Sequence, residues 1–433
     1  MHLRRWWASG LVVVMMASWL LALGVDALAG SSQQPVNLRI YWWGNQERHD
    51  RTLKALEAYR AKNPHVSFTP EFTAWSGYWD KLAVMVASGN PPDIIQMDYA
   101  YLLEYAQRGA LMDLAPWVGS ALVLDDMDPQ LAKAGMVDGK LYAISLGLNV
   151  QVLHVNRTLL SEAGLELPPL DWTWEDFFDY SRKVTGALGP QVWFSADFSG
   201  EINYFEHWVR QRGRPGIYQG NRLAIDEEDV ASWWAMWKSL RDQGLAPPAE
   251  VSLASSDELY NYLIVKRQAV AHRGWSNEHE RFAVVMQDEM VMTPLPRGGQ
   301  AEGHYPKSSM FFSVSSRSRH AEEAARFINW FIQAPEALDI LRSNRGTPVT
   351  SAGRALLQQM GLSQYDVKVF DIEDKILAFA GPVPPPAPKG GAEIRDLFER
   401  TSEEVQFGRR TPEDGARYFI AEATRILQRA ASQ

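Results

Sequence analysis

Aromatic and amide side chains gather where the first apolar segment of the chain ends. Residues 36–40 alternate between apolar and polar side chains, which predicts a β-strand that leads straight into Trp42-Trp43-Gly44-Asn45-Gln46. Ligands of open α/β sheets bind at the carboxyl ends of strands. Indole rings can stack on the C–H faces of sugar rings, and amides can hydrogen-bond hydroxyl groups. We therefore expect these two indoles and two amides to contact a carbohydrate, with packing in the core as the alternative for a ring, because neighbouring strand residues point to opposite faces.

A second group of candidates follows the next predicted strands. Trp75 and Tyr78 stand at the beginning of a predicted helix over residues 73–87, where they can stack on a ligand or pack in the core. Asp98 follows a short apolar strand at Ile94–Met97. Its carboxylate can accept charge-assisted hydrogen bonds from sugar hydroxyls, or it can cap the following helix, and both roles are compatible.

Three further candidates lie later in the chain. Asn149 belongs to a long strand with Gly147 in its middle, which could bend there and pass from one domain into another. Trp275 follows Gly274 at the exit of another apolar strand, at residues 269–271. Arg345 stands in an R-G-T-P turn, where its guanidinium could pair with a uronate carboxylate or bond backbone carbonyls of a hinge.

No catalytic or metal-binding pattern is present in the sequence. The chain lacks G-x-S-x-G, H-E-x-x-H, Walker A and G-x-G-x-x-G patterns, and its nine His residues are scattered, so we predict no cofactor and no metal site. A glycosidase needs two facing carboxylates, and Glu71 with Asp98 keeps a carbohydrate-active enzyme open as an alternative. Phenolate binding of iron by Tyr99, Tyr101 and Tyr105 is disfavoured, because the middle side chain points to another face of the helix.

Composition limits the class of partner. The 433 residues carry 43 Lys and Arg against 52 Asp and Glu, a net charge of −9, with no basic block. Such an acidic surface argues against nucleic acid and anionic lipid as partners. The absence of cysteine excludes disulfides, cysteine-ligated zinc, thiol catalysis and an acylated cysteine anchor.

The first residues have the organisation of a signal peptide. Arg4 and Arg5 precede an apolar segment at Leu11–Leu23, and Ala27-Leu28-Ala29 has the small residues of a cleavage site. We expect residues 1–29 to be removed near Ala29 and the protein to be exported to the periplasm. The alternative is an uncleaved N-terminal anchor.

The order of predicted elements indicates an α/β protein with two domains. Strand, helix and strand follow one another from residue 36 to residue 72, and a second α/β domain begins after residue 150. We expect the chain to cross between domains at Leu146–Val150, Met310–Ser315 and Arg345–Pro348. Trp233 and Trp237 are one helical turn apart and are predicted to be core residues.

An ordered set of motifs resembles the family-1 extracellular solute-binding proteins, the sugar-capturing components of ABC importers. The set comprises Y-W-W-G-N-Q at Tyr41, Y-W-D-K-L at Tyr78, S-G-N-P-P-D-I-I-Q-M-D at Ser88, D-G-K-L-Y at Asp138, V-N-R-T-L-L-S-E-A-G-L at Val155, W-T-W-E-D-F at Trp172 and R-G-T-P at Arg345. The first and third motifs look most like the branch that binds plant cell-wall oligosaccharides such as rhamnogalacturonan fragments.

The resemblance implies a two-lobed periplasmic-binding-protein fold of type II, with a cleft between lobes joined by a three-crossing hinge. We assign residues 36–147 plus 311–345 to the N-terminal lobe and residues 148–310 plus 346–433 to the C-terminal lobe. The implied function is capture of a mono- or oligosaccharide by lobe closure and its delivery to the permease subunits of an ABC importer. We expect a monomer. The alternatives are a secreted carbohydrate-active enzyme and a binder of another solute, such as a polyamine or a peptide.

Overall fold

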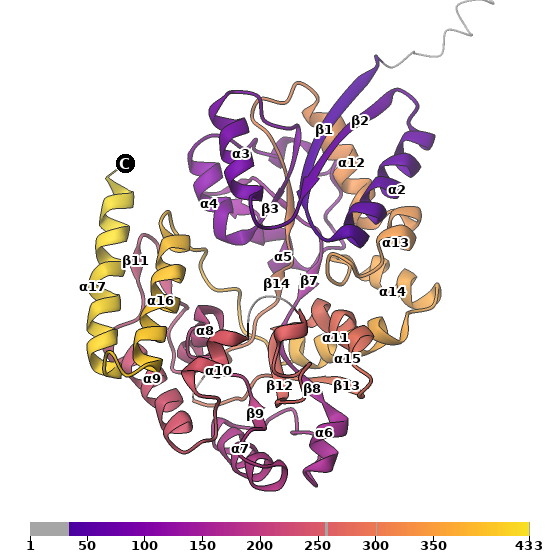
Figure 1. The fold of residues 1–433 in the computed structure, drawn as a ribbon. Helices are drawn as coiled ribbons and strands as arrows, with labels where there is room; N and C mark the ends of the chain where they lie inside the picture. The colour runs from indigo at the N-terminus through magenta and orange to yellow at the C-terminus, as the bar shows by residue number, and fades with distance from the viewer. Residues whose placement is uncertain (1–33, 256–258, 300, 433) are drawn as a thin grey trace, which may run out of the picture.

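The computed structural model describes residues 34–255, 259–299 and 301–432, which form two α/β lobes (Figure 1). Each lobe has its own core: one cluster of buried residues includes Ile40 and Phe312, and another includes Val270 and Trp233. The predicted two-lobed α/β fold is confirmed. The predicted signal peptide, residues 1–29, lies outside the described residues, so its cleavage stays a prediction.

The N-lobe is built on a five-stranded sheet in the order β2-β1-β3-β15-β6. β1 runs parallel to β2 and β3, whereas β15 runs antiparallel to β3 and β6. The strands are β1 (Val36–Trp43), β2 (Val66–Thr73), β3 (Ile94–Met97), β6 (Ile144–Ser145) and β15 (Phe311–Val314). The helices are α2 (Gln46–Lys62), α3 (Tyr78–Ala87), α4 (Tyr99–Gln107), α5 (Pro129–Ala134), α12 (Ala321–Gln333) and α13 (Pro335–Leu341), with a short hairpin of β4 (Met136–Val137) and β5 (Lys140–Leu141).

The burial of β1 changes along its length. Apolar and polar residues alternate at its beginning, but Ile40, Tyr41, Trp42 and Trp43 are all buried. Since successive strand residues point to opposite faces, the second half of β1 is covered on both sides. Trp42 and Trp43 therefore belong to different faces of the sheet.

The C-lobe contains a four-stranded sheet in the order β13-β8-β12-β9. Its strands are β8 (Gln151–Asn156), β9 (Trp193–Ser195), β12 (Ala269–Trp275) and β13 (Met290–Thr293), with a small hairpin of β10 (Tyr218–Gln219) and β11 (Arg222–Leu223). Its helices are α6 (Arg157–Glu162), α7 (Trp174–Leu188), α8 (Ile202–Gln211), α9 (Glu227–Asp242), α10 (Ala249–Ala254), α11 (His279–Val285), α14 (Ser351–Gln359), α15 (Gln364–Leu377), α16 (Gly391–Gln406) and α17 (Pro412–Ala431).

Three crossing segments lie side by side between the lobes (Figure 1). β7 (Leu148–Asn149) pairs with β14 (Lys307–Ser308), and Leu148 also exchanges two backbone hydrogen bonds with Thr347, of 2.8 and 3.0 Å. The predicted second crossing at Met310–Ser315 is wrong by a few residues. Phe311–Val314 is wholly buried and pairs inside the N-lobe sheet as β15, so the crossing itself is β14.

Over the part of the chain that the structure describes, no helix combines the length and the apolar character that a membrane span requires.

Candidate functional site

Two adjoining cavities lie between the lobes. The larger, of about 880 Å³, is lined by residues of both lobes, among them Trp43, Asn45 and Tyr365. The smaller, of about 200 Å³, extends toward α8 and α16. The two cavities share four lining residues: Trp75, Asp98, Trp275 and Lys307.

Two of the four shared residues are indoles that come from opposite lobes. Trp75 precedes α3 of the N-lobe and is 44% exposed, with its ring edge-to-face against Trp43 at 5.1 Å between centroids. Trp275 ends β12 of the C-lobe, where its backbone pairs with Gln151 and its N–H donates to Glu278 at 2.7 Å. A ligand in the junction of the cavities can therefore contact one aromatic ring from each lobe.

The N-lobe edge contributes the predicted polar groups. Asn45 caps α2 by accepting the N–H of Arg48 at 3.0 Å, and the residue also lines the larger cavity. Asp98 caps α4 by accepting the N–H of Ala100 at 2.9 Å, and it lines both cavities. Capping and cavity lining thus coexist at Asp98, as the sequence allowed.

Asn149 brings a hinge strand to the site. It lines the larger cavity from β7 and is buried. Its Oδ1 has no hydrogen-bond donor among the residues that the structure describes. A buried acceptor without a partner is costly, so this oxygen is an unfavourable feature of the hinge at the edge of the cavity.

Comparison with known proteins identifies the family. The model of the bacterial extracellular solute-binding proteins matches residues 54–355. The chain belongs to this family. A solved family-1 extracellular solute-binding protein from Alicyclobacillus acidocaldarius is 30% identical, with a TM-score of 0.74, and the match covers 92% of this chain and 100% of that one. The resemblance seen in the sequence motifs is confirmed.

Two further relatives have names that state a ligand. The multiple sugar-binding protein of Streptococcus mutans is 22% identical over 370 residues, or 79% of this chain and 81% of that protein. A periplasmic oligogalacturonide-binding protein of Yersinia enterocolitica, solved with saturated digalacturonic acid, has a TM-score of 0.79 and 23% identity, covering 91% of this chain and 99% of that one. The second likeness shows the shared fold.

Two predicted stacking residues of this solute-binding protein lie in the core instead. Trp42 is fully buried, donates from Nε1 to Nδ1 of His49 at 3.1 Å, and lines neither cavity. Tyr78 is also fully buried, its hydroxyl donates to the carbonyl of Gln96 at 2.6 Å, and its ring stacks on Tyr41. The expectation that these rings face a ligand is corrected, and Trp43, Trp75 and Trp275 remain as the aromatic candidates.

Two predicted polar contacts also point away from the cavities. Gln46 is exposed and donates to Asp50 at 2.8 Å within α2. Arg345 is 3% exposed, donates from Nη2 to the hydroxyl of Thr52 at 2.8 Å, and lies 5.2 Å over the ring of Phe331. Its turn sends the side chain into the N-lobe, so neither the predicted carboxylate contact nor the predicted bond to hinge carbonyls is formed.

The site contains charged residues that the sequence reasoning missed. Lys307 of β14 lies at the junction of the cavities, with Nζ 4.9 Å from the Trp275 ring. Arg395 of α16 lines the smaller cavity. A signal for Lys307 exists, because it is a lone cation directly before the apolar segment that returns to the N-lobe. Nothing in the local sequence marks Arg395.

Glu71 and Asp98, the two carboxylates considered for catalysis, do not share a cavity. Glu71 lies on β2, pairs with Arg39 at 3.0 Å and Lys81 at 3.1 Å, and lines neither cavity. Asp98 therefore has no facing carboxylate at Glu71. The arrangement suits binding rather than hydrolysis by this pair.

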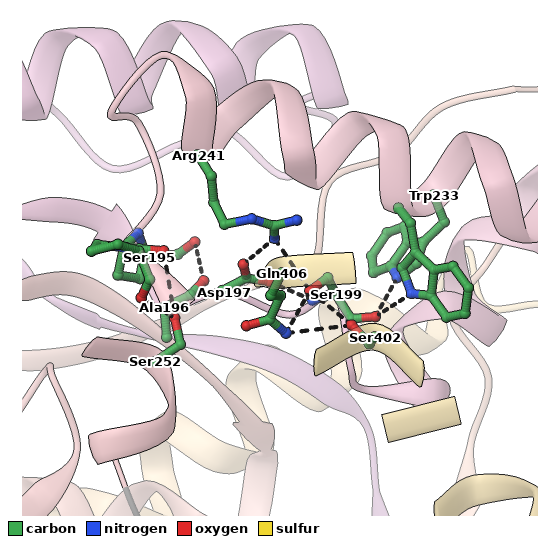
Figure 2. A network of polar contacts seen from close by, with 12 residues as sticks. Ser195, Ala196, Asp197, Ser199, Trp233, Arg241, Ser252, Ser402 and Gln406 are labelled. Carbon is green, nitrogen blue, oxygen red and sulfur yellow. Dashed lines mark hydrogen bonds and ion pairs between the residues drawn. The ribbon is translucent and has the colours of Figure 1, made fainter. Parts of the chain in front are cut away.

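The tryptophans of α9 belong to the C-lobe core, as predicted. Trp233, Trp234 and Trp237 are fully buried. Figure 2 shows the network around them: the carbonyl of Ser199 accepts both Trp233 and Trp234 at 3.0 Å. Arg241 forms an ion pair with Asp197 in the same network. Ser402 and Gln406 of α16 each donate a hydrogen bond to the hydroxyl of Ser199 at 3.1 Å. This network joins α9 to α16, the helix that carries Arg395.

Proposed function

We propose that this protein captures a sugar or oligosaccharide between its lobes and delivers it to the permease subunits of an ABC importer. The observation that carries the proposal is the pair Trp75 and Trp275, which line the junction of the cavities from opposite lobes. Aromatic faces suit the apolar faces of sugar rings. The sugar-binding names of relatives support this ligand class over other solutes.

Closure of the lobes is the proposed mechanism of capture. The N-terminal lobe, residues 36–147 plus 311–345, and the C-terminal lobe, residues 148–310 plus 346–433, move about the three crossings. A ligand that contacts both lobes binds the closed form better and shifts the population toward it. A shift from mostly open to mostly closed requires about 5 kcal/mol of differential affinity. Ring contacts and charge-assisted hydrogen bonds supply energies of this order.

The location and assembly state belong to the same proposal. Family membership implies an exported protein. We propose that it acts as a monomer in the periplasm after removal of residues 1–29. The native mass of the protein recovered from the periplasm of its host tests the monomer, and N-terminal sequencing tests the removal of residues 1–29.

A thermal-shift screen tests the proposed function. The protein without residues 1–29 is heated with neutral and acidic oligosaccharides and with polyamines, and the sugars are then analysed by mass spectrometry. A ligand that binds the native state raises the melting temperature. A shift with saccharide recovered intact supports the proposal. A shift only with polyamines, or a cleaved saccharide, overturns it in favour of another solute or an enzyme.

A further inference from the structure

Two cationic side chains face the smaller cavity from different elements. Lys307 comes from the crossing strand β14, and Arg395 comes from α16 of the C-lobe. Lys307 also lines the larger cavity. Lys307 thus lies where the cavities join, and Arg395 lies in the wall of the smaller cavity.

The ammonium of Lys307 has unused donors. It donates to the carbonyl of Ser308 at 3.3 Å and lies over the Trp275 ring, but it forms no ion pair with any residue that the structure describes. An ammonium group has three donors. Burial lowers the pKa of Lys307, the carboxylate of Asp98 partly offsets this effect, and the charge of Arg395 lowers the pKa further. The protein thus holds a buried positive charge at the junction that forms no ion pair with a described residue.

The guanidinium of Arg395 likewise has unused donors. Among the described parts of the chain, it has neither a hydrogen bond nor an ion pair, and it is half-exposed. Its guanidinium carries five N–H donors in a planar fork that matches a carboxylate. Because Arg395 and Lys307 repel each other, an anion between them would relieve the repulsion.

The two carboxylates that line the smaller cavity, Asp98 and Glu206, accept hydrogen bonds from other groups of the protein. Asp98 caps α4 through Ala100. Glu206 accepts the N–H of Ile217 at 3.2 Å and the hydroxyl of Tyr305 at 3.3 Å, and burial raises the pKa of its carboxyl. Neither carboxylate lies within ion-pair distance of Lys307 or Arg395, so the cations remain available to a ligand.

We propose that Lys307 and Arg395 bind a sugar carboxylate in the smaller cavity, and that the captured solute is therefore an acidic oligosaccharide. This inference rests on the proposed function and specifies its ligand class. In this arrangement a uronate unit occupies the smaller cavity, and the neighbouring unit lies between Trp75 and Trp275. Charge-assisted hydrogen bonds to both cations then discriminate against neutral sugars.

Isothermal titration calorimetry with matched ligands tests the inference. The protein without residues 1–29 is titrated with di- and trigalacturonate and with the same sugars after reduction of their carboxyl groups to alcohols. We expect the acidic sugars to bind at least tenfold more tightly, and their affinity to fall as NaCl is raised from 50 to 500 mM. Lys307→Met and Arg395→Gln each weaken the acidic sugars about tenfold, and binding of the reduced sugars changes less than twofold.

Arg400→Gln is the matched control, because Arg400 is an exposed cation on the same helix and lines neither cavity. It should leave both affinities unchanged. Tight binding of the reduced sugars only, or acidic binding that survives both cavity substitutions, overturns the inference while the proposed function stands. If none of these sugars binds, the inference is overturned, and the thermal-shift screen decides whether the proposed function stands. Urea unfolding of each variant shows whether a loss of affinity reflects a loss of folded protein.

Discussion

The backbone of Gly147 touches that of Arg345 where two crossings of the hinge meet: a Cβ added to Gly147 would lie 2.0 Å from the Arg345 carbonyl oxygen. The hydroxyl of Ser309, directly after the remaining crossing β14, donates to the same oxygen. All three crossings therefore pack around one carbonyl group. The hinge tolerates no side chain at position 147.

We predict that Gly147→Ala lowers the free energy of unfolding by about 3 kcal/mol, because the backbones of two crossings must separate. Urea denaturation followed by tryptophan fluorescence measures this change. Gly186→Ala is the control, since Gly186 lies in α7 with no atom within 4 Å of an added Cβ. That substitution should raise stability by about 0.5–1 kcal/mol. Equal effects of the two substitutions would contradict the close contact at the hinge.

We predict that Trp75→Ala and Trp275→Ala each weaken saccharide binding about tenfold, because each removes one aromatic face from the junction of the cavities. Calorimetry measures the affinity, and the melting temperature of the free protein reports on folding. Trp43→Ala, in contrast, should lower the melting temperature of the free protein, because Trp43 is 7% exposed and packs against Trp75 and Tyr78.

Tyr418→Ala is the control for the aromatic substitutions. Tyr418 is 37% exposed on α17, outside both cavities, and contacts Arg410. Its removal should leave affinity unchanged. Full affinity in both the Trp75 and Trp275 variants would rule out the proposed ring contacts.

The sequence predicted the edge of the site better than the orientation of each side chain. Trp43, Asn45, Asp98 and Trp275 line the cavities as expected, because the end of a strand follows from local patterns and sheet topology places these ends together. The burial of Trp42 and Tyr78 depends on helices packed on both faces of the N-lobe sheet. No local pattern specifies that arrangement.

Local sequence patterns did not predict the positions of residues that are placed by long-range packing. Arg345 enters the N-lobe core because its turn is fixed by contacts with two other crossings. Arg395 reaches the smaller cavity because α16 packs across the C-lobe, through contacts such as those of Ser402 with Ser199. Both placements depend on tertiary contacts between residues far apart in the chain.

Buried imidazoles predict a loss of stability in acid. Burial lowers the pKa of His207 to about 4, of His272 to about 3 and of His279 to about 4. The unfolded chain therefore takes up protons below pH 6.5 that the folded protein does not bind. Each such imidazole costs about 1.4 kcal/mol of stability per pH unit below 6.5, until the pH reaches the folded pKa.

We predict that His272→Phe reduces the loss of stability between pH 7.5 and pH 5 by about 2 kcal/mol. The phenyl ring keeps the aromatic contacts with Tyr262 and Phe282 but does not take up a proton. Urea denaturation at both pH values measures the difference. His320→Phe, at a half-exposed position before α12, is the control and should leave the pH dependence unchanged. An unaltered slope in the His272 variant would contradict a neutral buried imidazole.

Glu373 predicts a pH dependence of the opposite sign. It is fully buried on α15 and accepts the hydroxyl of Ser276 at 2.6 Å, and Ser276 in turn accepts the N–H of Val150 beside the hinge. Burial raises the pKa of Glu373 from 4.5 to about 7. The folded protein therefore binds a proton that the unfolded chain has lost. This contribution to stability is complete below pH 4.5 and disappears as the pH rises to 7.

We predict that Glu373→Gln is more stable than the wild-type protein by about 2–3 kcal/mol at pH 8 and of equal stability at pH 4.5, because the amide keeps the shape without a buried charge. Urea denaturation at the two pH values measures the difference. Glu57→Gln, on the exposed side of α2, serves as the control and should show no such pH-dependent gain. A Glu373→Gln effect that is the same at both pH values would mean that the folded protein holds this carboxylate ionised throughout, and that the Ser276 hydrogen bond compensates its burial.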